Sequence, residues 1–335
     1  MRLALFTSLA AAATLLATAN GLAQTLKVGT LAPEGSPWHD LLVDIGEKWK
    51  VDSGGRVTLH IYPGGVTGDE PDMIRKMRVG QLQAAALTGA GLALIAPEVQ
   101  ALQMPMMFAS YDELDYVRDR VAPKLEAAIE KQGFKVLNWG DAGWVRFFAK
   151  RPVIRPDDLK PLKIFTWEGD TTYVEAMKEM GYQPVPLAAT DIYTALQSGL
   201  IDAFPTTAIA ALSFQWFGLA NHMTDVRWAP LVGALIVSTN AWRSVPDDLK
   251  PILARDAADA AIAARAKIRP LEDQAIVAMQ AHGLVVHTVP KDALAEWEAT
   301  ARIGDQKIIG KAVPAAMVGE VEHLRDQYRA EKKGP

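Results

Sequence analysis

The side chains that most often perform chemistry are present in this sequence, but their spacing matches no catalytic motif. The chain has neither a G-x-S-x-G nucleophile elbow nor an H-E-x-x-H zinc helix. The run Gly-Ala-Gly at residues 89–91 follows a predicted strand, yet it lacks the third glycine of a dinucleotide-binding fingerprint. Asp157 and Asp158 open a turn, where carboxylates usually cap backbone N–H groups, and His39 lies at the exposed start of a helix. We therefore expect no catalytic residues and no enzyme.

Metal ions, cofactors and nucleic acid are not expected either. The six histidines lack the spacing of metal ligands, and a chain without cysteine cannot build a thiolate site. A net charge of −4 provides no basic surface for nucleic acid. The function class that remains is the binding of a small molecule.

The N-terminus has the three parts of a secretory signal. Arg2 supplies the positive charge, residues 3–16 are apolar apart from Thr and Ser, and small residues stand at Gly21 and Ala23. We expect cleavage near Ala23 and export of the mature chain, most simply to a periplasm. The alternative is an uncleaved membrane anchor, for which the apolar stretch is short.

The periodicity of the mature chain predicts an α/β protein. Strand and helix patterns alternate as β-α-β-α-β over the first ninety mature residues, which implies crossover connections and a mostly parallel sheet. Two strands are predicted at 134–139 and 144–148, and a second β-α-β-α pattern starts at residue 157. Residues 231–239 are a candidate for a strand that crosses between lobes. Residues 247–282 read as one long helix that Pro270 kinks.

The length of 335 residues suggests about two domains of roughly 100–200 residues each. Because no flexible linker separates them, we expect the chain to pass between the lobes more than once. Residues 24–143 with about 232–260 are assigned to a first α/β lobe. Residues 144–231 with about 261–335 are assigned to a second lobe and the C-terminal helices.

Short motifs follow one another along nearly the whole mature chain. The most specific is IYTALQSG at 192–199 with IDA at 201–203; the others are LKVG at 26–29, SPWH at 36–39, GGRV at 54–57, YPGG at 62–65 and DDLK at 157–160. In order and spacing they resemble the solute-binding proteins of tripartite ATP-independent periplasmic (TRAP) transporters, of the dicarboxylate-binding or DctP type. The resemblance implies a two-lobed periplasmic binding protein fold with crossing strands and a long bracing helix. It also implies an integral-membrane TRAP-type permease as partner, driven by an ion gradient.

The resemblance also places a ligand site, and this sequence departs from the family there. Typical members bind a carboxylate through an Arg at the end of the strand after the DDLK-like motif, and here that position is Phe165. A second family Arg matches Arg146, and a family Asn aligns roughly with Thr206. An aromatic ring cannot form the bidentate ion pair of a guanidinium, so we expect a more hydrophobic or less carboxylate-dependent ligand.

Several alternatives stay open at this point. The aromatic residues around Phe165 are either ligand contacts or ordinary core. Arg146 either holds one anionic group of an organic acid or pairs with Asp141 or Glu168 to brace the lobes. An exported enzyme, or a sensor or interaction protein on the same fold, is the alternative function. The complete set of expected ligand contacts is Trp38, Thr88, Trp144, Arg146, Phe165, Trp167, Glu168, Phe204 and Thr206.

Overall fold

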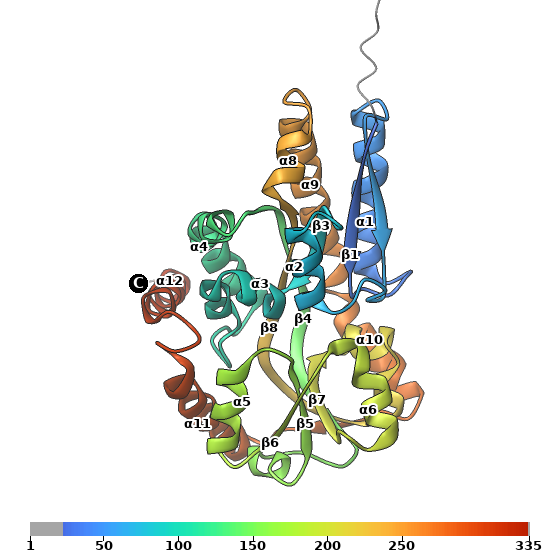
Figure 1. Ribbon diagram of the computed structural model, residues 1–335. Coiled ribbons are helices and arrows are strands. Elements are labelled where there is room, and N and C mark those ends of the chain that lie inside the picture. Colours follow the sequence, from blue (N-terminus) through green and yellow to red (C-terminus); the bar gives the residue numbers. More distant parts are fainter. Residues whose placement is uncertain (1–22, 334–335) are drawn as a thin grey trace, which may run out of the picture.

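The computed structural model describes residues 23–333, and the predicted signal peptide lies outside this range except for Ala23. Figure 1 shows two lobes, one above the other, joined by two long strands that run through both. Within residues 23–333 no helix combines the length and apolarity needed to cross a membrane.

The first lobe contains three parallel strands, β1 (Gln24–Thr30), β2 (Val57–Tyr62) and β3 (Ala84–Thr88). β1 pairs in parallel with both β2 and β3, which confirms the β-α-β-α-β start predicted from the sequence. The helices of this lobe are α1 (Pro37–Asp52), α2 (Glu70–Arg78), α3 (Gly89–Ile95), α4 (Tyr111–Lys131) and α8 (Thr239–Ser244). At the start of α1, Ser36 accepts a hydrogen bond from the backbone N–H of His39 and Pro37 follows it, as the sequence predicts.

The second lobe repeats this organisation. Its strands are β5 (Lys163–Trp167), β6 (Gln183–Leu187), β7 (Ala203–Thr207) and β9 (Val285–Thr288). Its helices are α5 (Thr171–Glu179), α6 (Ile192–Ser198), α7 (Ala208–Ser213), α10 (Leu271–Ala281) and α11 (Lys291–Ile308). Helices cover both faces of the sheet in each lobe, so the strands carry apolar residues on both faces.

Two crossing strands, β4 (Phe134–Ala149) and β8 (His222–Ser238), join the lobes into one nine-stranded sheet. The sheet order is β2-β1-β3-β8-β4-β7-β5-β6, with β9 on the far end of β8. The sequence predicted two strands within 134–149, and that division is wrong. β4 runs on through the apparent turn because β-bulges absorb it, with Gly143 at a φ of 110° that favours glycine.

The last helices brace the lobes from outside. The predicted long helix is two helices, α9 (Lys250–Ile268) and α10, separated at Arg269 and Pro270. The indole N–H of Trp49 in α1 donates to the carbonyl of Leu253 in α9 at 2.9 Å, whereas α10 packs on α7 of the second lobe. The final helix, α12 (Ala315–Lys333), packs on α4 in the first lobe. The lobe boundaries assigned from the sequence stay a prediction.

Candidate functional site

Two adjoining chambers lie in the cleft between the lobes. The first has a volume of about 170 Å³ and is lined by α1, β1, β3, α7, α9 and the middle of the crossing strands; we call it the α9 chamber. The second, the α3 chamber, has about 230 Å³ and is lined by α3, the end of β5 and the middle of β8. The wall that they share consists of Glu70, Phe165, Trp167, Pro205, Thr206 and Leu231. Both lobes thus contribute to a small, mostly apolar site, as is usual for a ligand-binding cleft.

Most of the expected ligand contacts come together here. The α9 chamber is lined by Trp38, Thr88, Phe165, Trp167 and Thr206, and Glu168 lines the α3 chamber. Phe165 is 1% exposed and meets Trp167 edge-on, with 5.6 Å between the ring centroids. The ring of Phe165 is therefore both a core residue of the second lobe and a part of the chamber wall.

Three of the expected contacts lie elsewhere: of the described residues that line the two chambers, none is Trp144, Arg146 or Phe204. Trp144 is fully buried against the ring of Tyr111, at 5.4 Å between centroids. Phe204 is fully buried and stacks on Phe148 at 5.3 Å. For these two aromatics the structure favours the core interpretation.

Arg146 is 2% exposed and already has anionic partners. One Nη donates to Glu272 of α10, and Nε lies 3.3 Å from Asp225 of β8. The sequence offered Asp141 or Glu168 as its partner, and both suggestions are wrong. Because Glu272 also accepts from the hydroxyl of Tyr111 at 2.7 Å, Arg146 belongs to a polar network that does not line the two chambers.

Glu70 is a buried carboxylate that the sequence did not indicate. It accepts hydrogen bonds from the backbone N–H of Thr88 at 2.6 Å, from the Thr88 hydroxyl at 2.8 Å, and from the N–H of Gly91 at 2.7 Å. These bonds attach α2 to the start of α3 and occupy the Thr88 side chain. Burial nevertheless raises the pKa of Glu70 to about 7.

Arg265 of α9 also lines the α9 chamber, and the sequence reading missed it. It lies on the same helix face as Ala261, Ala264 and Ile268, which line the chamber with it. A signal was present, because positions 261, 264, 265 and 268 have the i, i+3, i+4, i+7 spacing of an inward-facing stripe. A cation within an apolar, inward-facing stripe is unusual, so the sequence alone could have identified Arg265 as a candidate site residue.

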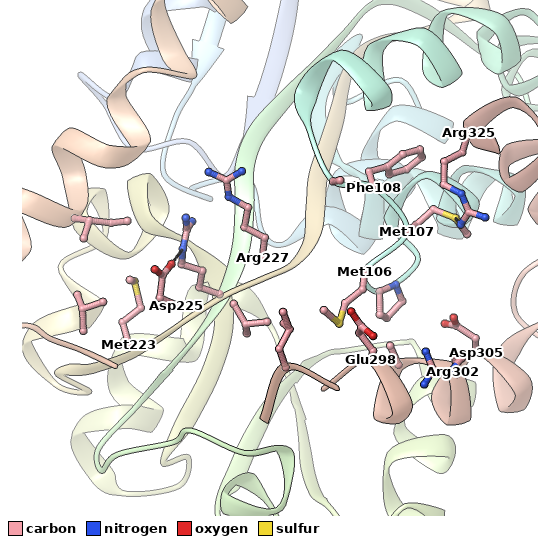
Figure 2. Close-up of a pocket in the computed structure, with 18 of the residues that line it drawn as sticks. Met106, Met107, Phe108, Met223, Asp225, Arg227, Glu298, Arg302, Asp305 and Arg325 are labelled. Atoms are coloured by element: carbon pink, nitrogen blue, oxygen red, sulfur yellow. Dashed lines mark hydrogen bonds and ion pairs between the residues drawn. The ribbon is translucent and has the colours of Figure 1, made fainter. Parts of the chain in front are cut away.

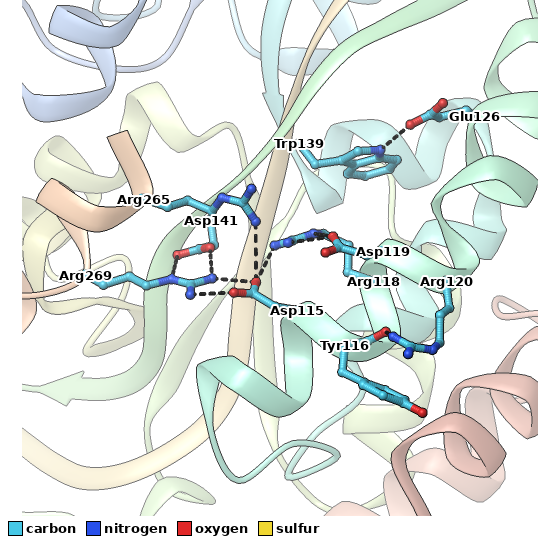
Figure 3. Close-up of polar contacts among 10 residues, drawn as sticks. All are labelled: Asp115, Tyr116, Arg118, Asp119, Arg120, Glu126, Trp139, Asp141, Arg265 and Arg269. Atoms are coloured by element: carbon cyan, nitrogen blue, oxygen red, sulfur yellow. Dashed lines mark hydrogen bonds and ion pairs between the residues drawn. The ribbon is translucent and has the colours of Figure 1, made fainter. Parts of the chain in front are cut away.

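Arg265 belongs to a group of ion pairs at the edge of the chamber (Figure 3). Arg269 donates to both oxygens of Asp115 at 2.7 Å and to Asp141 at 2.7 Å. Arg118 also reaches Asp115 at 2.7 Å. These pairs connect α4, the middle of β4 and the end of α9. They therefore hold the end of α9, which lines the chamber, against α4 of the first lobe.

A larger hollow of about 1060 Å³ lies on another side of the crossing strands (Figure 2). It is lined by residues around Met106 and Phe108, by Arg227 of β8, and by charged side chains of both signs from α11 and α12, such as Arg302 and Asp305. Arg146 lines this hollow. Apart from Asp305, its charged side chains have ion-pair partners or face solvent, so the smaller, mostly apolar cleft chambers are the better candidate for a ligand. Within residues 23–333 no three His, Asp or Glu side chains are arranged to hold a metal ion.

Two α/β lobes, two crossing strands, a bracing helix and an enclosed cleft between the lobes define the class of two-lobed solute-binding proteins. The sequence matches the family described as "Bacterial extracellular solute-binding protein, family 7" (DctP) over residues 28–308. The chain belongs to this family, and the resemblance to TRAP solute-binding proteins of the DctP type is confirmed. It is a family of transport proteins rather than of enzymes.

Relatives of known name are distant but cover most of the chain. The chain is 24% identical to the 2,3-diketo-L-gulonate-binding periplasmic protein YiaO of Escherichia coli over 79% of its own length and 81% of that protein. It is also 24% identical to the C4-dicarboxylate-binding periplasmic protein DctP of Rhodobacter capsulatus over 76% of each chain.

The fold matches solved structures closely. A TRAP periplasmic solute-binding protein from Bradyrhizobium with bound galacturonate has a TM-score of 0.83 at 24% identity, over 90% of this chain and 100% of that one. A protein of the same kind from Shewanella oneidensis with bound succinate has a TM-score of 0.84 at 16% identity, over 90% of this chain and 99% of that one.

Proposed function

We propose that this chain is an extracytoplasmic solute-binding protein that captures a small ligand by closure of its two lobes and delivers it to a TRAP-type membrane permease. Three features support the proposal: the family, the signal-like N-terminus at residues 1–23, and the cleft, whose walls come from both lobes. A ligand that contacts both lobes stabilises the closed form over the open form. The closed form is then the shape that the permease recognises.

We further propose that the ligand has a larger apolar part than the galacturonate and succinate bound in the similar structures, or than the C4-dicarboxylates for which one relative is named. The observation that carries this proposal is the position of Phe165, which stands in the shared wall of the chambers. The resemblance to the family leads us to expect an Arg at this position. Trp38, Trp167 and Trp216 line the α9 chamber with it. Each chamber is below the roughly 300–1,000 Å³ of drug-sized sites, which favours a compact ligand.

The alternatives have less support. An organic acid held by Arg146 would need a guanidinium that Glu272 and Asp225 already pair. An enzyme would need titratable groups that are free to react in the cleft. In the α9 chamber both carboxylates are occupied, because Glu70 accepts from Thr88 and Gly91 and Asp141 pairs with Arg269.

Ligand titration by calorimetry tests the ligand class. We expect the purified protein to prefer 3-phenylpropanoate and 4-methylpentanoate over succinate and D-glucuronate. Phe165→Arg should shift this preference toward succinate, because it places a cation in the wall. Tyr193→Arg places the same cation on the exposed surface of α6 and should change nothing. Tighter binding of succinate or glucuronate by the unaltered protein would overturn the proposed ligand class.

A further inference from the structure

Arg265 is the one cation among the described residues that line the two cleft chambers. Its side chain is 21% exposed and comes from α9, so it reaches the α9 chamber from a helix rather than from the sheet. The resemblance to the family leads us to expect a cation on β5 instead, at the position of Phe165. Arg265 thus supplies a guanidinium to the site from α9.

The hydrogen-bonding capacity of Arg265 is largely unused. Its nearest anionic atom is Oδ1 of Asp115, at 3.5 Å from Nη1. That oxygen already has Arg118 and Arg269 at 2.7 Å each, so Arg265 is the third and most distant cation on it. Within residues 23–333 Arg265 donates no hydrogen bond that meets ordinary distance and angle limits. Figure 3 shows its guanidinium at the edge of this group.

The surroundings of Arg265 favour the arrival of an anion. Burial, and then the nearby positive charge of Arg118, lower the pKa of Arg265. A planar guanidinium with free N–H groups matches a carboxylate in a two-bond geometry, and such a pair is stronger in a water-poor chamber than in solvent. An incoming carboxylate would thus supply both the missing acceptor and the missing negative charge.

A second unpartnered donor lines the same chamber. The indole Nε1 of Trp38 is buried, and in the described part of the chain it has no acceptor. The acidic groups of the chamber are occupied, because Glu70 accepts three hydrogen bonds and Arg269 holds Asp141. The free polar groups at Trp38 and Arg265 are therefore donors, and donors require an acceptor-rich ligand group.

We propose that Arg265 binds the carboxylate of an apolar monocarboxylic acid whose hydrocarbon part lies against Phe165 and Trp167. This inference rests on the proposed function, since it assumes that the cleft binds a small ligand. It adds the ligand's functional group, its orientation in the cleft, and the residue that selects acids over neutral molecules.

Paired probes separate the charge from the hydrocarbon part. The probes are 3-phenylpropanoate and 4-methylpentanoate, each compared with its own primary amide by calorimetric titration. We expect each acid to bind about 10- to 100-fold more tightly than its amide, as loss of one charge-assisted pair requires. Arg265→Gln should lower the affinity for the acids by that factor and leave the affinity for the amides unchanged. Arg265→Lys should fall between, because it keeps the charge but not the planar fork.

Controls show that the effect belongs to this side chain. Lys267 is an exposed cation two residues further along α9, and Lys267→Gln should bind the acids like the unaltered protein. Thermal unfolding of Arg265→Gln should stay within a few degrees of the unaltered protein, because Asp115 keeps Arg118 and Arg269. If Arg265→Gln does not fold, two measurements still test whether Arg265 binds the carboxylate. They are the comparison of acid with amide in the unaltered protein and the affinity of Arg265→Lys for the acids.

The possible outcomes test the role of Arg265 separately from the proposed ligand class. Equal binding of acid and amide, or undiminished acid binding by Arg265→Gln, overturns the role of Arg265 and leaves the apolar cleft in place. If neither the acids nor the amides bind, the inference and the proposed ligand class fail together.

Discussion

The carboxylate of Asp69 in the first lobe accepts a hydrogen bond from the backbone N–H of Ala189 in the second lobe, at 2.8 Å. The other oxygen of Asp69 accepts from the N–H of Glu70, also at 2.8 Å, and so caps α2. Asp69 is 6% exposed, and burial raises the pKa of its carboxyl group. One side chain therefore begins a helix in one lobe and holds the opposite lobe across the cleft.

Asp69→Asn should weaken ligand binding without unfolding the protein. The amide oxygen can still cap α2, but the amide nitrogen then faces the N–H of Ala189 and the contact between lobes is lost. Because this contact exists only when the lobes are together, its loss of about 1–2 kcal/mol should reduce affinity roughly 5- to 30-fold. Titration with the tightest-binding acid measures the loss.

A matched control is available on the same helix. Asp72 is partly exposed and pairs with Arg75 three residues further along α2. Asp72→Asn should leave the affinity unchanged. Equal affinities for Asp69→Asn and the unaltered protein would show that the contact does not contribute to closure.

The pair of Arg146 and Glu272 should act on stability rather than on ligand choice. Arg146→Gln leaves a buried Glu272 without its cation, which we expect to cost about 3–5 kcal/mol of unfolding free energy. The double variant with Glu272→Gln should recover part of this loss. Urea unfolding measures the unfolding free energies of the single and the double variant. The exposed pair of Arg155 with Asp292 provides the control, and Arg155→Gln should cost less than about 1 kcal/mol.

Ligand binding by Arg146→Gln tests the alternative that Arg146 holds an organic acid. The affinity of Arg146→Gln for the apolar acids should equal that of the unaltered protein under conditions where both are folded. A loss of affinity without a loss of stability would instead make Arg146 the residue that holds an acidic ligand.

Much of the fold follows from patterns within short segments. Caps, turns and periodicity predict the elements around Ser36 and the start at β1, because they depend on neighbouring residues. The continuity of β4 does not follow in this way. The run at 140–143 has the composition of a turn, and only the pairing of β4 with β8 on one side carries the strand through it.

The site was predictable only in part, for a similar reason. The resemblance predicted Phe165, Trp167 and Thr206 as ligand contacts, and all three line the cleft chambers. The alternation of apolar and polar residues could not distinguish these three residues from Trp144 and Phe204. Both sheet faces are covered in each lobe, so core positions and cleft positions have the same sequence pattern. Glu272 lies 126 residues beyond Arg146 in the chain, so no local signal could reveal that the arginine was already paired.

Trp38 and Trp139 should respond in opposite ways to the same substitution. The Nε1 of Trp38 is buried without an acceptor in the described part of the chain, whereas that of Trp139 donates to Glu126 at 2.9 Å. Trp38→Phe removes an unsatisfied donor and should change the unfolding free energy by less than about 1 kcal/mol, yet reduce acid affinity several-fold. Trp139→Phe should lower stability by about 1 kcal/mol and leave affinity unchanged. If Trp38→Phe binds the acids as tightly as before, its indole N–H does not face the ligand.

Asp305→Asn should make the protein more stable at pH 8 and change little at pH 4. Burial, and then the charge of Glu322, raise the pKa of Asp305 to about 7, and its Oδ1 has no hydrogen-bond partner among the described residues. The folded state therefore holds this proton more tightly than the unfolded state, so stability falls as pH rises from about 4 to 7. After allowance for solvent screening the effect is on the order of 1–2 kcal/mol. Urea unfolding at pH 4, 6 and 8 measures the difference between variant and unaltered protein. Asp273→Asn, an exposed change in the same hollow, is the control. A variant that is less stable at pH 8 would show that the carboxylate has a stabilising partner in solution.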